Sequence, residues 1–136
     1  MHSTNYTNTL IEIAEDCPAI QGEIPPVKGS KKSVANLQYE MLHRHPYKYT
    51  SDDVLFAVFA KRKGFPEEAL DEQRHIFFSK GQPCFRASPL TKQYGWGVHS
   101  NDEGKIALFG VESEAYQNLV ADKSVTKKKA MRTKRA

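Results

Sequence analysis

The sequence predicts an α+β domain, in which a small, mostly antiparallel sheet of three to four strands carries three to four helices on one face. Three observations predict this class. From Tyr94 to His99, large residues alternate with glycine, and a period of two is that of a β-strand. Residues 33–45 and 51–63 place apolar residues at helical spacing. A strand, then helices, then strands and a last helix is an order typical of α+β proteins.

The first half of the chain contains the clearest helix signals. Residues 9–14 predict a strand, and residues 19–32, which are rich in proline and glycine, predict a loop. Ser33 is a favourable N-cap for a helix that runs to about residue 45. Thr50 begins a second and more apolar helix, because Asp53 three residues later completes a sequence that resembles a capping box.

The second half adds a third helix and a hairpin. Residues 66–78 predict the helix, and residues 83–87 predict a short edge strand. Residues 100–104 predict a turn, after which residues 105–111 form the return strand of the hairpin. A last helix begins at about Glu112.

The strand that contains the single tryptophan is expected to support the core. Tyr94, Trp96 and Val98 share one face of it, which we expect to be buried. The other face holds two glycines and His99, and is either covered closely by a neighbour or left as a shallow floor. Truncating a buried tryptophan costs about 3–5 kcal/mol, out of the about 5–15 kcal/mol that stabilise a domain. We therefore predict that Trp96→Ala largely unfolds the protein.

Length and composition indicate one globular domain of a cytoplasmic protein. The chain has 136 residues, of which 39% are hydrophobic, and no apolar run approaches the roughly 20 residues that span a bilayer. Its first residues lack the pattern of a signal peptide. The two cysteines, Cys17 and Cys84, are therefore expected to be reduced thiols.

The net charge of +4 hides an asymmetry along the chain. Seven of the 20 basic residues follow residue 122, where there is no Asp or Glu, so residues 1–122 contain 13 basic and 16 acidic residues. We expect residues 1–122 to form the domain and residues 123–136 to be a flexible basic tail. No internal repeat divides the chain further.

Three segments carry a resemblance to a known family: TNYTNTLIEIAEDCP at the start, YTSDDVLFAVFAKRKG in the second helix, and the long segment KGQPCFRASPLTKQYGWGVHSNDEGKIALFGVESEAY. With the MRTKRA ending, the chain resembles a family of small bacterial proteins classified only as a domain of unknown function. The resemblance implies no activity, cofactor or catalytic residue. It suggests that the segment from Lys80 to His99 is the signature of the family.

Cys84 is a candidate catalytic nucleophile, with His99 or His75 as its base. Cysteine chemistry needs the thiolate, which positive charge from Lys80 and Arg86 would favour. The alternative is that Cys84 packs as a small hydrophobic residue, which is how free cysteines most often behave.

The loop after residue 80 is a candidate anion site, because its side chains supply positive charge and hydroxyl donors. The residues concerned are Lys80, Arg86, Ser88, Thr91 and Lys92. Their spacing lacks the glycine-rich cradle of a P-loop. The alternative is a solvated loop beside an edge strand.

The basic tail is a candidate nucleic-acid site through Lys127, Lys128, Lys129 and Arg132, which could neutralise phosphates. Stacking on exposed aromatic residues would strengthen such binding, and the candidates are Tyr94, Trp96 and Phe85. The alternative is a solubilising tail with the aromatic residues in the core.

Neither a metal site nor a cofactor is predicted, since the histidines are scattered and no CxxC or HExxH spacing occurs. Three classes of function stay open. The first is a non-enzymatic module that binds an anion or nucleic acid through the Lys80–Lys92 loop and the tail. The second is a small enzyme that uses Cys84, Arg86 and His99. The third is a structural or interaction protein that forms homo-oligomers through an exposed sheet edge.

Overall fold

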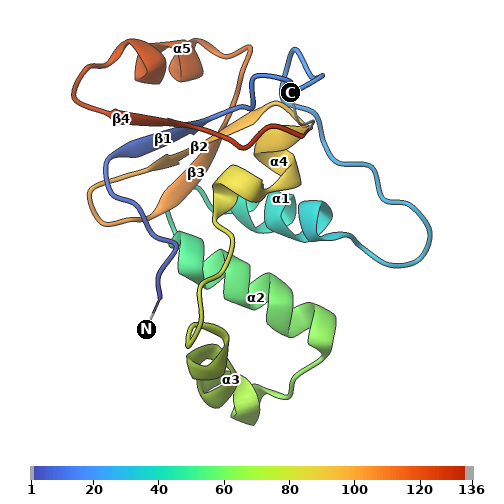
Figure 1. Cartoon of the computed structure of the whole chain (residues 1–136). Helices are drawn as coiled ribbons and strands as arrows, with labels where there is room; N and C mark the ends of the chain where they lie inside the picture. The colour runs from blue at the N-terminus through green and yellow to red at the C-terminus, as the bar shows by residue number, and fades with distance from the viewer. Residues whose placement is uncertain (1, 134–136) are drawn as a thin grey trace.

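The computed structural model describes residues 2–133 and confirms the α+β class (Figure 1). In chain order the helices and strands are β1 (Thr9–Glu12), α1 (Val34–Arg44), α2 (Ser51–Lys63), the 3₁₀ turn η1 (Glu67–Ala69), α3 (Leu70–Phe77), the 3₁₀ turn η2 (Phe85–Ala87), α4 (Pro89–Lys92), β2 (Trp96–Ser100), β3 (Ile106–Gly110), α5 (Glu114–Ala121) and β4 (Thr126–Lys129).

The four strands form one sheet in the order β3-β2-β1-β4. β2 is antiparallel to both of its neighbours, whereas β4 is parallel to β1. Val98 in the centre of β2 lies opposite Ile11 on one side and Leu108 on the other. The predicted hairpin is therefore confirmed, and the sheet is mostly antiparallel, as expected.

Helices cover both faces of the sheet, which corrects the expectation of a single covered face (Figure 1). On one face, α1, α2 and the segment of η2 close the main core, in which Val98 packs with Leu37, Val54 and Phe85. On the other face lies α5. Its Tyr116 ring sits so close to the strand that a Cβ atom added at Gly97 would lie 2.5 Å from it. The glycine thus allows α5 to approach the sheet.

Local signals define the two long helices where the sequence predicted them. Ser33 and Thr50 are N-caps whose side chains accept from the backbone three residues later, and both complete a capping box. Gly64 ends α2 in the left-handed conformation, with φ of 74°. α3 then packs back on α2 through phenylalanines, with the Phe59 and Phe77 ring centroids 4.6 Å apart.

The predicted edge strand at residues 83–87 is wrong. These residues form η2, in which the Ala87 N–H donates to the Cys84 carbonyl and the Ser88 N–H to the Phe85 carbonyl. Ser88 then caps the short helix α4, which starts at Pro89 and which the sequence did not predict. Because Phe85 is only 1% exposed, the tight turn serves to bury this ring in the core.

The flexible tail is also corrected, because residues 126–129 form β4. Val125 and Ala130, which flank the strand, are 6% and 4% exposed. The Thr126 N–H donates to Asn8 O at 3.0 Å, and the Ala130 N–H donates to Glu12 O at 2.9 Å. Residues on both sides of position 122 thus share one sheet. Residues 134–136 of the predicted tail lie outside the described part of the chain.

The strand β2, which begins at Trp96, supports the core and also anchors a loop. Val98 is 1% exposed, but Trp96 is only partly buried and packs on Tyr39. The indole Nε1–H donates to Glu23 O at 2.8 Å, and Asn36 Nδ2 donates to Pro25 O, also at 2.8 Å. These contacts anchor the long loop between β1 and α1. No helix in the described residues is long and apolar enough to cross a membrane.

Candidate functional site

A cleft of about 1100 Å³ lies between α1, α2, the end of α3 and the segment of residues 82–89. It forms because α3 packs mainly on α2 and η1, well away from the sheet (Figure 1). The chain must then cross from α3 back to α4, and this crossing closes one side of the cleft. Ligand pockets for small molecules typically measure about 300–1,000 Å³, so the cleft is of sufficient size.

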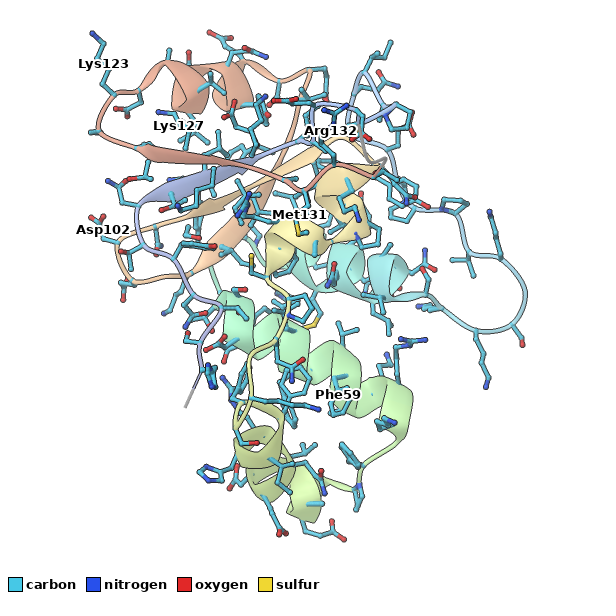
Figure 2. The ribbon with its side chains drawn as sticks, viewed as in Figure 1. Phe59, Asp102, Lys123, Lys127, Met131 and Arg132 are labelled. Atoms are coloured by element: carbon cyan, nitrogen blue, oxygen red, sulfur yellow. The ribbon has the colours of Figure 1, made fainter. Side chains whose placement is uncertain are left out.

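The inner surface of the cleft is apolar. We call it the apolar floor, and its residues are Val34, Leu37, Leu55, Val58, Phe59 and Phe77. Leu37 and Val58 belong to the core, whereas Val34 and Leu55 are partly exposed along the cleft. Figure 2 shows Phe59 on α2, in the half of the molecule opposite the sheet. The apolar faces of the helices are thus not fully covered here.

The edge of the cleft is basic, and we call it the basic rim. Its residues are Lys31, Lys32, Lys61, Arg62 and Lys63. The first two come from the loop before α1, and the other three form the last turn of α2. Among the described residues that line the cleft there is no Asp or Glu. The charge on this rim is therefore of one sign, and it borders an apolar surface.

One carboxylate lies beside the basic rim without lining the cleft. Lys32 Nζ is 2.7 Å from Glu40 Oε1 on α1, and this bond lowers the pKa of Glu40. On the α2 side, Lys63 Nζ lies 5.8 Å from the centre of the Phe59 ring. Glu40 partly neutralises one side of the rim, so an incoming anion would compete with it for Lys32.

Cys84 lines the cleft at the start of η2. Its Sγ lies 3.6 Å from the Tyr6 hydroxyl and accepts from the Arg86 N–H at 3.4 Å. Burial raises the pKa of Tyr6, and the contact with Cys84 raises it further. The tyrosine therefore stays a neutral hydroxyl next to the sulfur. Cys17 and Cys84 are both free thiols, as the sequence predicted.

The structure does not bring His99 to Cys84. His99 lies on the face of β2 that points to the side of α5, and its Nδ1 is 2.8 Å from the Tyr47 hydroxyl. Burial lowers the pKa of His99 and raises that of Tyr47. His75 is exposed on α3 and does not line the cleft. The predicted thiol and imidazole pair is thus separated by the sheet.

The predicted anion loop is divided by the fold. Ser88 lines the cleft, but its Oγ already donates to Gln38 Oε1 at 2.6 Å. Thr91 is 0% exposed and donates to Phe85 O, so it cannot reach a ligand. Arg86 Nε donates to Lys129 O at 2.7 Å and so holds the end of β4. Lys80 and Lys92 do not line the cleft.

The predicted nucleic-acid residues lie on and just after β4, on the side of the molecule away from Phe59 (Figure 2). Lys127 Nζ donates to Val125 O at 2.6 Å and also contacts the carbonyl of Asp122. Lys128, Lys129 and Arg132 are exposed. Phe85 is buried and cannot stack on a base, which corrects one of the three predicted stacking residues.

Sequence reasoning missed the basic rim as a site. Residues 61–63 end α2, where basic residues are favourable for the helix dipole, so they do not stand out as a binding site. A usable signal existed, since two short runs of basic residues lie before α1 and at the end of α2. Nothing local, however, shows that the two runs border one cleft. Within residues 2–133, no three His, Cys, Asp or Glu side chains gather to hold a metal ion.

Comparison with known proteins identifies the family but no activity. Residues 1–136 match the profile of a family described as a family of unknown function (DUF6157), so the chain belongs to that family. The searches of curated proteins and of solved structures each returned no match.

Proposed function

We propose that this DUF6157 protein is a non-enzymatic binding module for an anionic ligand, which it holds in the cleft between α1, α2 and residues 82–89. The observation that carries the proposal is the sign of the charges. The described residues that line the cleft include five basic residues and no acidic one. The body of the chain is acidic, so such a segregation of charge favours a site for an anion.

The proposal moves the anion site predicted from the sequence. The Lys80–Lys92 loop supplies a wall of the cleft through Cys84 and Ser88, while the charge comes from the basic rim. Arg62 offers a planar fork that can bind two oxygens of a carboxylate or phosphate at once. A ligand that covers the adjoining apolar floor would displace water from it, which would strengthen each of these charge interactions.

A variant of the basic rim with a matched control tests the proposal. Lys61→Ala/Arg62→Ala/Lys63→Ala removes three charges from the rim, and Lys123→Ala/Lys128→Ala/Lys129→Ala removes three exposed charges from the β4 side. Binding of a panel of carboxylates and phosphate esters is measured by calorimetry. We expect the rim variant to bind at least tenfold more weakly and the control to change affinity by less than twofold. Equal losses in both variants would show non-specific charge attraction instead.

A second candidate function is thiol chemistry at Cys84, which is favoured by its place in the cleft and by its contact with Tyr6. The hydroxyl and the Arg86 N–H can both donate to a thiolate. With Cys17→Ser as background, we expect Tyr6→Phe to slow alkylation of Cys84 at neutral pH. An unchanged rate would indicate that Tyr6 does not activate the Cys84 thiol and that Cys84 only lines the cleft.

Nucleic-acid binding and oligomerisation receive less support. A gel shift of the full chain, the rim variant and the Lys123→Ala/Lys128→Ala/Lys129→Ala control at two salt concentrations tests the first. Binding that only the control loses would favour a nucleic-acid site on the β4 side. Lysines along the outer strand β4 oppose edge-to-edge pairing with a second copy. We also propose a cytoplasmic location in a bacterial cell, which the two free thiols support as far as the reducing compartment is concerned.

A further inference from the structure

We infer that the anion bound in the cleft is an amphiphile, with one negatively charged head group on a long alkyl or acyl chain. The inference rests on the proposed function, since it assumes that the basic rim holds an anion. It goes further because it assigns a role to the apolar floor. A small inorganic anion would contact the basic rim and leave the whole floor unused.

The apolar floor offers surface along most of the cleft. Val34 on α1 faces the cleft from one side, and Leu55 and Phe59 on α2 face it from below. All three are partly exposed, although they pack against buried core residues. An alkyl chain lying on them would remove apolar surface from water, which is the main source of affinity for such a ligand.

The polar side chains inside the cleft already have hydrogen-bond partners within the protein, so they do not require a polar ligand. Ser88 and Gln38 bond to each other at 2.6 Å, and the Ser88 oxygen also accepts from the Leu90 N–H at 3.1 Å. Among the described residues, no buried side-chain nitrogen or oxygen lacks a hydrogen-bond partner. The buried polar side chains of the cleft walls therefore have hydrogen-bond partners. The charged groups that a ligand can reach are those of the basic rim.

The aromatic residues of the floor favour a chain over a nucleobase. Stacking of a base requires a free ring face. The Phe59 ring is packed against Phe77 at 4.6 Å and Phe65 at 5.9 Å, and Lys63 lies 5.8 Å from its centre. These contacts surround the ring, so that its edges and the aliphatic side chains are what a ligand meets. Such a surface suits a flexible hydrocarbon.

The test compares ligands that differ only in head or chain. Ethyl, octyl and dodecyl phosphate are titrated into the full chain below their micelle concentrations, beside inorganic phosphate, dodecanol and dodecyltrimethylammonium. Full burial of a methylene strengthens binding about fourfold. With partial burial we expect dodecyl phosphate to bind at least tenfold more tightly than octyl phosphate. The neutral and cationic ligands should bind at least tenfold more weakly than dodecyl phosphate.

Variants place the ligand in the cleft. Leu55→Gln alters the apolar floor, and Ile24→Gln makes a comparable change at an apolar residue that is 70% exposed outside the cleft. We expect Leu55→Gln to weaken dodecyl phosphate binding at least fivefold and Ile24→Gln to leave it unchanged. In the Cys17→Ser background, bound dodecyl phosphate should protect Cys84 from a maleimide. Circular dichroism confirms that each variant is folded, and the protection assay on the otherwise unchanged chain needs no floor variant.

Each outcome bears on a different claim. If affinity is independent of chain length but falls in the Lys61→Ala/Arg62→Ala/Lys63→Ala variant, the amphiphile is excluded while the anion site stands. If no anion binds, the proposed function itself fails. If dodecyl phosphate binds without protecting Cys84, or binds the rim variant equally well, the ligand is adsorbed elsewhere on the protein and the inference is overturned.

Discussion

Lys61, Arg62 and Lys63 end a helix beside a cleft, whereas Lys127, Lys128 and Lys129 line the outer strand of the sheet. Each cluster is a run of three basic residues. The surface next to the first cluster consists of the apolar floor and the two other lysines of the basic rim. Around the second, backbone carbonyls bind the ammonium group of Lys127, and the strand edge faces solvent.

The difference shows that surroundings, and not charge, decide what a basic run does. Lys127 donates to the carbonyl of Asp122, the C-cap of α5, where a cation is favourable for the helix dipole. Lysines on an edge strand also hinder pairing with other chains. The β4 cluster therefore contributes to the fold and hinders pairing at this edge of the sheet, while the side chains of the basic rim border the cleft.

The strongest test of the β4 side is Val125→Asp. Val125 is 6% exposed at the start of β4, so the variant must bury a carboxylate or release the strand. We expect it to lose about 3–5 kcal/mol of unfolding free energy in urea titrations. Lys123→Asp, two residues earlier and exposed, is the control and should lose less than about 1 kcal/mol. A stable Val125→Asp protein would mean that β4 is not part of the folded sheet.

Trp96→Ala tests how the sheet supports the basic rim, because the indole anchors the loop that leads to Lys31 and Lys32. The ring is only partly buried, so we now expect a loss of about 2–3 kcal/mol, less than the near-complete unfolding predicted from the sequence. Trp96→Phe removes the bond to Glu23 and should cost about 1 kcal/mol. If Trp96→Ala melts like the unchanged protein, the loop has no need of this anchor.

Glu40→Gln sharpens the description of the basic rim. It removes the carboxylate that binds Lys32 at 2.7 Å and that would compete with a bound anion. We expect two- to threefold tighter binding of an anion in calorimetry, because an exposed ion pair is worth only about 0–1 kcal/mol. Glu12→Gln, on the distant strand β1, should leave the affinity unchanged. Weaker binding by Glu40→Gln would show that the pair positions Lys32 for the ligand.

The smallest effect concerns pH and His99, which shares a sheet face with Lys127 through their common neighbour Leu10. Burial lowers the pKa of His99, although Asp102 and Asp122 act in the opposite direction. The folded state thus binds this proton less readily than the unfolded chain. Stability is complete above the unfolded value of about 6.5 and falls as the pH drops towards the lower folded value.

His99→Gln keeps a hydrogen-bonding group near Tyr47 but cannot be protonated. We expect the unfolding free energy of the unchanged protein to decline between pH 7 and 5 more steeply than that of the variant. His43→Gln, at an exposed position on α1, is the control and should retain the steeper decline. Parallel curves for all three proteins would mean that burial of His99 has no effect on its protonation.

Elements with local signals were predictable. Ser33 and Thr50 predict the starts of their helices because an N-cap and its partner lie three residues apart. The hairpin of β2 and β3 was predictable because it joins strands that are close in sequence. η2 was missed because Phe85 and Ala87 alternate as in a strand, and only the burial of Phe85 shows that they turn. The predicted contact of Cys84 with His99 failed because the two lie on opposite sides of the sheet.

By itself the sequence determined the helices α1 and α2, the hairpin, the α+β class and the supply of basic residues. Tertiary structure alone decided where the basic residues act. Thr126 joins Thr9 in a parallel pair across more than a hundred residues, and backbone hydrogen bonds of this kind leave no pattern in the side chains of TKKK. The cleft likewise exists only where α1, α2 and residues 82–89 meet, since the shape of a cavity depends on several segments that are distant in sequence.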